Sequence, residues 1–155
     1  MPLAQAQGAE PRHVLFACSL NAVRSPMAEG ILRHLAGKRI KVRSAGVRAG
    51  DVDRFCETVM GELGIDISKH KPTPISTYED EPVDLIISLS PEAHHQALEW
   101  TRVHPVKVEY WPTLDATALP EDADDDLILE SYRKVRDQLF RRIKQRFLLT
   151  GSPSV

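Results

Sequence analysis

Cysteine is scarce in this sequence, with only Cys18 and Cys56 among 155 residues. Two thiols are too few for a disulfide framework, and their positions match neither a Cys-x-x-Cys pair nor the Cys and His spacing of a zinc site. We therefore expect no metal and no other cofactor. A chain without a disulfide framework fits a reducing, cytoplasmic location, which is our expectation here.

Long apolar runs and an excess of basic residues are also missing. No stretch reaches the roughly 20 apolar residues of a membrane-spanning helix. The formal net charge is −2, which gives no general attraction to nucleic acid, so neither a membrane nor nucleic acid is an expected partner. The hydrophobic content of 42% suits one globular domain. We place this domain at residues 12–150, after a flexible leader at residues 1–11.

The most informative segment that is present is the octapeptide Cys18-Ser19-Leu20-Asn21-Ala22-Val23-Arg24-Ser25. It follows the apolar run 13–17 and precedes a helical pattern that starts at Pro26. That order predicts a strand, a loop and a helix. Backbone N–H groups at the start of a helix, together with those of a loop turned inward, can bind an anion.

Four side chains of this loop suit a tetrahedral oxyanion and an attack on it by sulfur. Arg24 offers a planar fork of donors to two oxygens of one phosphate. These positive surroundings favour the nucleophilic thiolate form of Cys18. Ser25 either donates its hydroxyl to the sulfur or caps the helix, and Asn21 tolerates a left-handed backbone.

The rest of the chain alternates between short apolar runs and helical patterns. Strands are predicted at residues 14–17, 40–45, 85–89 and 106–110, and helices at 26–36, 54–63, 91–100 and across 128–147, with an irregular connection at 68–82. This alternation predicts an α/β domain of three layers, in which helices cover both faces of a central four-stranded parallel sheet. Ligands of such folds bind at the carboxyl ends of the strands, where the Cys18 loop begins.

The pattern Cys-x5-Arg-Ser-Pro-Met-Ala-Glu after an N-terminal strand resembles the low-molecular-weight protein tyrosine phosphatases, a family that also includes the thioredoxin-coupled arsenate reductases. The similarity continues through Ser44-Ala45-Gly46, Leu63-Gly64-Ile65-Asp66, residues 84–87 and Trp111 to Asp115. The resemblance implies hydrolysis of a phosphomonoester, with phosphotyrosine in proteins as the expected substrate, through a phosphocysteine on Cys18. Phosphate would be held by Arg24 and by the loop at Ser19, Leu20, Asn21, Ala22, Val23 and Ser25.

Asp115 stands where this family has the aspartate that protonates the leaving group and then activates water. A proline usually follows that aspartate, whereas Ala116 follows here. Asp115 is therefore the predicted general acid and base. The alternatives are that it is an ordinary solvated loop acid, or that Asp122 or Asp124 serves instead.

Other positions also depart from the family pattern. Leu20 replaces a usual glycine, which costs about 1 kcal/mol if its φ is positive. Val23 stands where a second cysteine is common, and the aromatic residues that line a phosphotyrosine slot are not evident. Ser44 either supports the loop through hydrogen bonds or is an ordinary strand end. Phosphomonoester chemistry is therefore a firmer expectation than tyrosine specificity.

Two other functions stay open. An arsenate reductase of the same fold needs further cysteines for a disulfide relay, and only Cys56 is available. A non-catalytic phosphate-sensing or partner-binding module would keep the loop without turnover. We interpret Cys56 as a small core residue and His70 as a surface loop residue. The expected partner is a phosphorylated protein or a small phosphomonoester, and the chain is expected to be a monomer or a weak dimer.

Overall fold

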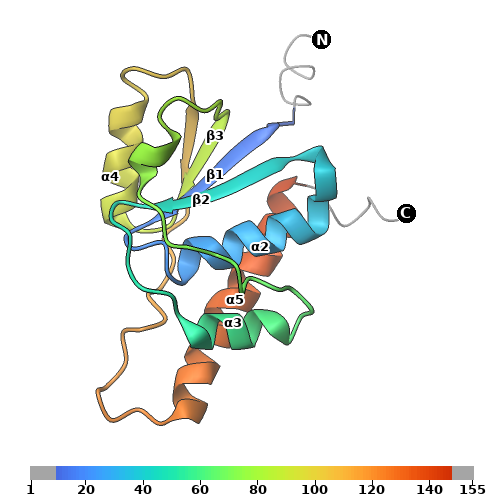
Figure 1. Ribbon diagram of the computed structural model, residues 1–155, viewed down its shortest axis with the longest axis vertical. Helices are drawn as coiled ribbons and strands as arrows, with labels where there is room; N and C mark the ends of the chain where they lie inside the picture. The colour runs from blue at the N-terminus through green and yellow to red at the C-terminus, as the bar shows by residue number, and fades with distance from the viewer. Residues whose placement is uncertain (1–9, 148–155) are drawn as a thin grey trace.

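A four-stranded parallel sheet forms the centre of the computed structural model, which describes residues 10–147 (Figure 1). Its strands are β1 (His13–Cys18), β2 (Lys41–Gly46), β3 (Leu85–Ser88) and β4 (Lys107–Tyr110). They lie in the order β2-β1-β3-β4, and each neighbouring pair is parallel. The predicted α/β fold is thereby confirmed. The proposed leader lies almost wholly outside the described residues, as do positions 148–150 of the proposed domain.

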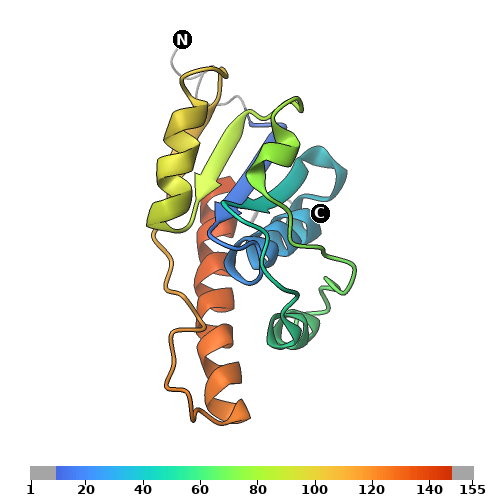
Figure 2. The ribbon, with the colours of Figure 1, turned by 60° about the vertical axis from the view of Figure 1, so that its left-hand side comes forward.

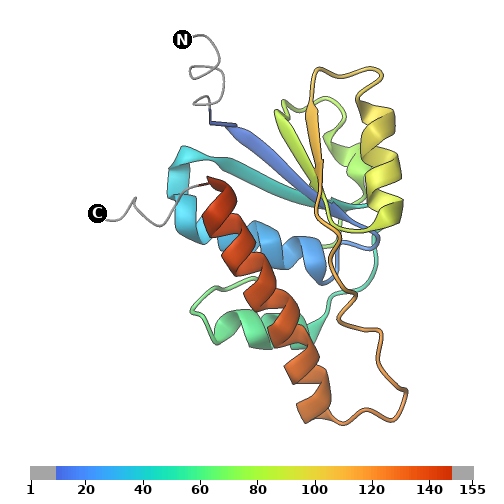
Figure 3. The same ribbon diagram turned by 180° about the vertical axis from the view of Figure 1, so that it is seen from behind.

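Within the described residues, four α-helices flank the sheet: α2 (Arg24–Ala36), α3 (Arg54–Gly61), α4 (Pro91–Trp100) and α5 (Asp125–Phe147). Two short 3₁₀ helices, η1 (Gly37–Arg39) and η2 (Ile75–Tyr78), lie in the connections. Figure 2 shows α4 on one face of the sheet and α5 on the other. Seen from behind, α5 lies across both α2 and α3 (Figure 3). No helix between residues 10 and 147 combines the length and apolarity that crossing a bilayer requires.

Short oxygen-bearing side chains begin three of these helices. At α3, Asp53 Oδ1 accepts a hydrogen bond of 2.9 Å from the Cys56 N–H. At α5, Asp124 Oδ1 accepts one of 2.9 Å from the Leu127 N–H. Ser90 caps α4 in the same way. Helix α2 has no side-chain cap, so the N–H groups of its first turn stay available for a ligand.

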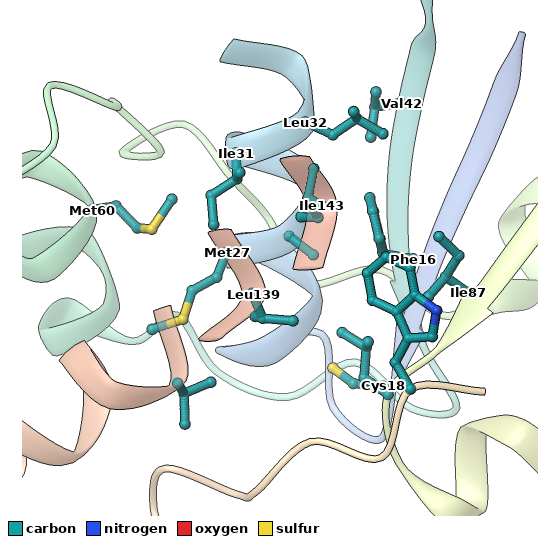
Figure 4. Packing of buried hydrophobic residues seen from close by; sticks show 14 of the residues in the cluster. Phe16, Cys18, Met27, Ile31, Leu32, Val42, Met60, Ile87, Leu139 and Ile143 are labelled. Carbon is teal, nitrogen blue, oxygen red and sulfur yellow. The ribbon is translucent and has the colours of Figure 1, made fainter. Parts of the chain in front are cut away.

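The inner strands β1 and β3 are buried on both faces, as their unbroken apolar runs require. On one face, Phe16 and Ile87 pack with residues of α2, α3 and α5 (Figure 4). On the other face, Leu15 and Ile86 pack against α4. Each such fully buried side chain contributes about 1.5–3 kcal/mol, and the packing on both faces fixes where the strands end.

The structure differs from the sequence prediction at two places that matter for the site. Helix α2 begins at Arg24 rather than at Pro26, so the arginine belongs to the first helical turn. The segment 68–82 is not wholly irregular, because it contains η2 and because Pro74 forms an isolated parallel bridge with Gly46. This bridge brings the segment against the end of β2, next to the loop that follows β1.

Candidate active site

Cys18 is the last residue of β1, and the loop after it curls around its sulfur. The Asn21 N–H donates to Cys18 Sγ at 3.3 Å, and Ser25 Oγ lies 2.9 Å from the same sulfur. Figure 4 shows Cys18 at the edge of the buried hydrophobic cluster. Both polar partners lie within hydrogen-bond distance of a sulfur that is otherwise packed among apolar groups.

Asn21 holds the shape of this loop. It has a φ of 56°, and no other non-glycine residue from 10 to 147 has a positive φ. Its Nδ2 donates to Ser25 Oγ at 2.8 Å and to Ser44 Oγ at 2.9 Å, while its Oδ1 accepts from the Thr73 N–H at 2.9 Å. These bonds within a buried site offset the cost of the left-handed backbone.

The direction of this network follows from its fixed donors. The Thr73 N–H can only donate, which orients the Asn21 amide so that Nδ2 faces the two serines. Ser25 Oγ therefore accepts from Asn21, and its own proton is left for Cys18 Sγ or for the more distant carbonyl of Ala45 at 3.3 Å. Of the two roles open to Ser25, this geometry supports the hydroxyl as a donor to the sulfur.

Ser44 and His70 also hold Asn21 through hydrogen bonds. Ser44 Oγ accepts a hydrogen bond from Asn21 and donates one to Glu29 Oε1 at 2.6 Å. Ser44 is therefore more than a strand end. The interpretation of His70 as a surface residue is wrong, because its Nε2 lies 2.8 Å from the Asn21 carbonyl oxygen and its side chain is only 16% exposed. A carbonyl only accepts, so Nε2 carries the proton.

Arg24 joins the loop to the segment that follows β4. Its Nη1 donates to the Thr113 carbonyl at 3.1 Å. A guanidinium has five N–H donors, so this contact leaves most of them for the oxygens of a ligand. Arg24 is the first residue of helix α2, which has no side-chain cap. Its guanidinium and the free N–H groups of the first helical turn are therefore donors at the same end of the helix.

Asp115 lies two residues beyond Thr113, in the segment that Arg24 contacts. Its Oδ1 accepts from the Thr117 hydroxyl at 2.7 Å and from the Thr117 N–H at 2.9 Å. Partial burial opposes its charged form, but the Thr117 hydrogen bonds and the positive charge of Arg24 outweigh burial and lower the pKa of Asp115. Of the alternatives, Asp124 is engaged in capping α5, and Asp122 is exposed in the same connection.

The remaining loop residues have distinct environments. Ser19 Oγ lies 3.1 Å from Ser90 Oγ, at the start of α4. Leu20 is 44% exposed. Its φ is not positive, so the cost expected for a left-handed backbone at this position does not arise. Ala22 is partly exposed, and Val23 is buried. An added Cβ at Gly46 would lie 2.7 Å from the Asn21 nitrogen, so only glycine allows β2 to end this close to the loop.

Cys56 is nearer to the loop than its place in the sequence suggests. Its Sγ lies 3.7 Å from the Val23 carbonyl oxygen, and its side chain is fully buried. Burial raises the pKa of Cys56 most, and the negative charge of Asp53 raises it further. It is therefore a neutral thiol packed in the core, as its sequence position suggested.

An aromatic wall that was not evident in the sequence lies beside the Asp115 segment. The rings of Phe55 and Tyr132 are 5.9 Å apart, and the Tyr132 hydroxyl donates to Asp53 at 2.7 Å. Both rings line a cavity of about 370 Å³ that also includes Thr117. Tyr132 fits the helical periodicity of a core residue, so only the packing of α3 against α5 reveals this wall. Within the described residues, no group of three or more His, Cys, Asp or Glu side chains could hold a metal.

In sequence, the chain is similar to a phosphatase family and to proteins named arsenate reductases. A family model described as low molecular weight phosphotyrosine protein phosphatase matches residues 13–148. The glutaredoxin arsenate reductase of a Synechocystis species is 32% identical over 86% of this chain and 94% of that protein. The arsenate reductase of Bacillus subtilis is 32% identical over 92% of this chain and 99% of that protein.

Solved structures of a tyrosine phosphatase and of an arsenate reductase have a similar fold. The low molecular weight protein tyrosine phosphatase from T. tengcongensis has a TM-score of 0.73 at 26% identity, over 87% of this chain and 97% of that one. An arsenate reductase in its oxidised state has a TM-score of 0.73 at 30% identity, over 88% of this chain and 97% of that one.

A nucleophilic cysteine at the end of a parallel strand, cradled by a loop that opens a helix, defines a cysteine-dependent enzyme of the phosphatase fold. The chain belongs to the low molecular weight phosphotyrosine protein phosphatase family.

Proposed function

We propose that this protein hydrolyses phosphomonoesters, with phosphotyrosine in proteins as its substrate, through a phosphocysteine on Cys18. The observation that carries this proposal is the pair of polar partners on Cys18 Sγ, Ser25 Oγ at 2.9 Å and the Asn21 N–H at 3.3 Å. Both can stabilise a thiolate when it forms and when it leaves. Arg24 and the N–H groups at the start of α2 supply the positive site that a phosphate requires.

In the first step, the Cys18 thiolate attacks phosphorus in line with the ester oxygen. The S–P bond forms as the P–O bond breaks, and the Asp115 carboxyl gives its proton to the departing oxygen. Arg24 holds the equatorial oxygens. The pKa of Asp115 is low in the free protein, but a phosphate dianion bound beside it places like charges together and raises that pKa. The acid form is then available when the ester binds.

In the second step, the Asp115 carboxylate takes a proton from water, and the water oxygen attacks phosphorus. The S–P bond breaks and inorganic phosphate leaves. The sulfur regains its negative charge, which the Ser25 hydroxyl and the Asn21 N–H stabilise. Electrons and protons balance over the two steps without an external oxidant or reductant.

The aromatic wall supports an aryl ester rather than an alkyl ester. Phe55 and Tyr132 line a cavity that includes Thr117, the residue that holds Asp115. A phenyl ring gains much of its binding free energy from such walls, at about 0.5–1.5 kcal/mol for each aromatic pair beyond area burial. Cys18, Arg24 and Asp115 do not line this cavity, so its support for a phosphotyrosyl substrate is that aromatic walls lie beside Thr117, the hydrogen-bond partner of Asp115.

Arsenate reduction is the second candidate, because curated relatives at 32% identity are named arsenate reductases. In that reaction a thiol must finally reduce the arsenic, and a disulfide or mixed disulfide must form. Cys56 lies close to the loop, but it is buried and its raised pKa disfavours the thiolate. We therefore rank this function below hydrolysis for the chain.

The deciding experiment is a metal-free burst assay with an activated aryl phosphate on the wild type, Cys18→Ser and Asp115→Ala. We expect a burst in the wild type, no product with Cys18→Ser, and slower turnover with Asp115→Ala. A parallel assay measures arsenate-dependent oxidation of reduced thioredoxin and reduced glutathione, with Cys56→Ser as the control. Oxidation that depends on Cys56, without a phosphate burst, would establish the arsenate reductase instead. Phosphate binding without turnover in either assay would identify a non-catalytic module.

A further inference from the structure

A second cavity, of about 460 Å³, lies between α2 and the segment that precedes η2. Neither Cys18, Arg24 nor Asp115 lines it, so it is separate from the substrate site. Its volume falls within the range of about 300–1,000 Å³ that small-molecule sites occupy in proteins. The function proposed above makes no use of it.

Two of the three basic Lys and Arg side chains in this cavity, those of Lys69 and Lys71, are less engaged than its acidic side chains and than Arg33. Glu29 is held by Arg33 at 2.6 Å. Asp66 Oδ1 accepts from the Ser68 N–H at 2.8 Å, and the hydrogen bonds from Ser68 lower the pKa of this carboxyl.

Lys69 and Lys71 both line the cavity as well, and neither forms a salt bridge to any described residue. The cavity is thus an anion-attracting place on a chain whose formal net charge is −2.

The cavity lining also includes apolar side chains and one phenol. Ile65 and Ile67 contribute aliphatic surface. Tyr78 also lines the cavity, and burial raises the pKa of its hydroxyl. The phenol is therefore neutral and can donate a hydrogen bond. A molecule that combines an apolar body with one anionic group matches this lining.

The cavity also shares residues with the network that holds the catalytic loop. Ser44, His70 and Thr73 all line it. Each of these residues makes a hydrogen bond to Asn21, through Oγ, Nε2 and the backbone nitrogen respectively. An occupant would therefore touch the residues that fix the left-handed backbone of Asn21, whose N–H faces the Cys18 sulfur.

We propose that this cavity binds a small organic anion, with its carboxylate or phosphate group at Lys69 and Lys71 and its apolar body against Ile65 and Ile67. By holding Ser44, His70 and Thr73 in place, the bound anion favours the loop conformation that receives phosphate. Linkage is reciprocal, so each ligand raises the affinity for the other by about fivefold or more. Binding at the cavity stands without the proposed function, whereas an effect on turnover rests on it.

The test uses 2-naphthoate, which has the required apolar body and charge and cannot be hydrolysed. Amide NMR spectra are followed during a titration of protein that is already saturated with inorganic phosphate, so that the Cys18 loop is occupied. We expect the largest shifts at residues 64–73. We also expect phosphate titrations to give a lower Kd for phosphate when 2-naphthoate is present. In a separate test, 1-naphthyl phosphate, which is also a slow substrate, should compete with 2-naphthoate for the cavity.

Matched charge changes separate this site from general attraction to basic residues. Lys69→Glu/Lys71→Glu should weaken the naphthoate affinity about tenfold or more, because charge-assisted contacts are the strong ones. Lys38→Glu/Lys107→Glu makes the same change of net charge at exposed positions outside the cavity, and it should leave the affinity unchanged. Near-UV circular dichroism of both variants checks that they are folded.

Several outcomes would overturn this inference. Shifts confined to residues 19–24 would mean that naphthoate binds only at the substrate site. Equal weakening in both charge variants would mean unspecific attraction, and tighter binding of potassium or ammonium than of naphthoate would mean a cation site. Unchanged phosphate affinity would remove the coupling. Shifts at 64–73 in a protein without phosphatase activity would instead contradict the proposed function and leave the cavity site standing.

Discussion

Ser25 is the residue through which the buried Asn21 amide acts on the nucleophile. Its oxygen accepts from Asn21 Nδ2 at 2.8 Å, so its single proton has two acceptors: the sulfur at 2.9 Å and the more distant Ala45 carbonyl at 3.3 Å. A hydroxyl that donates to the nearer sulfur needs no reorganisation when Cys18 becomes a leaving group in the second step. Ser25 therefore matters most where the phosphocysteine breaks down.

Ser25→Ala tests this role. We expect turnover of an aryl phosphate to fall about 100-fold, as for the loss of one preorganised donor. The burst should persist, because breakdown of the intermediate slows more than its formation. Ser19→Ala is the matched control, since Ser19 contacts Ser90 and not the sulfur. Equal losses in both variants, or a lost burst, would contradict the assignment.

Asn21 combines a backbone requirement with a side-chain requirement, and two substitutions separate them. Asn21→Ala removes three hydrogen bonds within a buried site and places a Cβ residue at a φ of 56°. We expect a loss of about 3 kcal/mol in the free energy of unfolding, measured with urea. Asn21→Gly keeps the favourable backbone and should lose about 1 kcal/mol less. The same loss in both variants would mean that the φ carries no cost.

Thr117 sets the protonation of Asp115 through a hydroxyl bond of 2.7 Å. Thr117→Val removes that bond, which lowers the pKa of Asp115 in the wild type, so the pKa should rise in the variant. An acid catalyst works only when protonated, and kcat therefore falls as pH rises through the pKa that Asp115 has when the ester is bound. We expect this falling limb to move to higher pH in Thr117→Val. The pH profile of Asp115→Asn should lack this falling limb. A falling limb at the same pH in Thr117→Val and in the wild type would mean that another group causes it.

At the scale of elements, α3 and α5 are joined by an ion cluster just beyond the end of α3. Glu62 accepts from Arg133 Nη2 at 2.7 Å and from Arg136 Nη1 at 2.8 Å. Arg136 is buried and also donates to the Val59 carbonyl at 2.7 Å. The hydrogen bonds from Arg133 and Arg136 lower the pKa of Glu62 to about 2. This cluster therefore holds the C-terminal end of α3 against α5.

The cluster predicts a specific pH dependence of stability. The pKa of Glu62 is lowered on folding, so its contribution is present above its usual pKa of 4.5 and is lost as pH falls toward about 2. Because the side chain is partly exposed, we expect a contribution of about 1 kcal/mol. The difference in unfolding free energy between wild type and Glu62→Gln should shrink over that acidic window. Glu99→Gln, in an exposed pair with Arg102, should show little difference at any pH.

The sequence predicted the elements and residues whose structure is set by adjacent residues. It did not predict the contacts between segments that are far apart in the chain. The strand, loop and helix around Cys18 follow from one contiguous pattern, and so do the positions of Asn21 and Ser25. His70 contacts Asn21 from 49 residues away, in a proline-rich segment with no periodicity. Phe55 and Tyr132 meet only because α3 packs on α5. Contacts of this kind require the topology of the sheet, which local propensity does not encode.

At the scale of the whole molecule, the two faces of the sheet share their central strands. Along β1, Phe16 faces the cluster of α2, α3 and α5, while its neighbour Leu15 faces α4. Loss of either face would expose apolar side chains of the same strands to water. We therefore expect the single domain proposed for residues 12–150 to unfold in one cooperative transition.

The two tryptophans report on opposite faces and can test this cooperativity. Trp100 is buried in the cluster with α4, and Trp111 is buried in the other cluster, where its ring packs edge-on against Phe16. In Trp100→Phe and Trp111→Phe, the remaining tryptophan follows one face during unfolding in urea. Its fluorescence transition should coincide with the circular dichroism of the same variant. A midpoint that does not change with protein concentration would fit a monomer, because an obligate dimer gains stability with concentration. If the fluorescence of Trp100 in Trp111→Phe changed at lower urea than the circular dichroism, β1 and β3 would not couple the two faces. The chain would then contain two cooperative units.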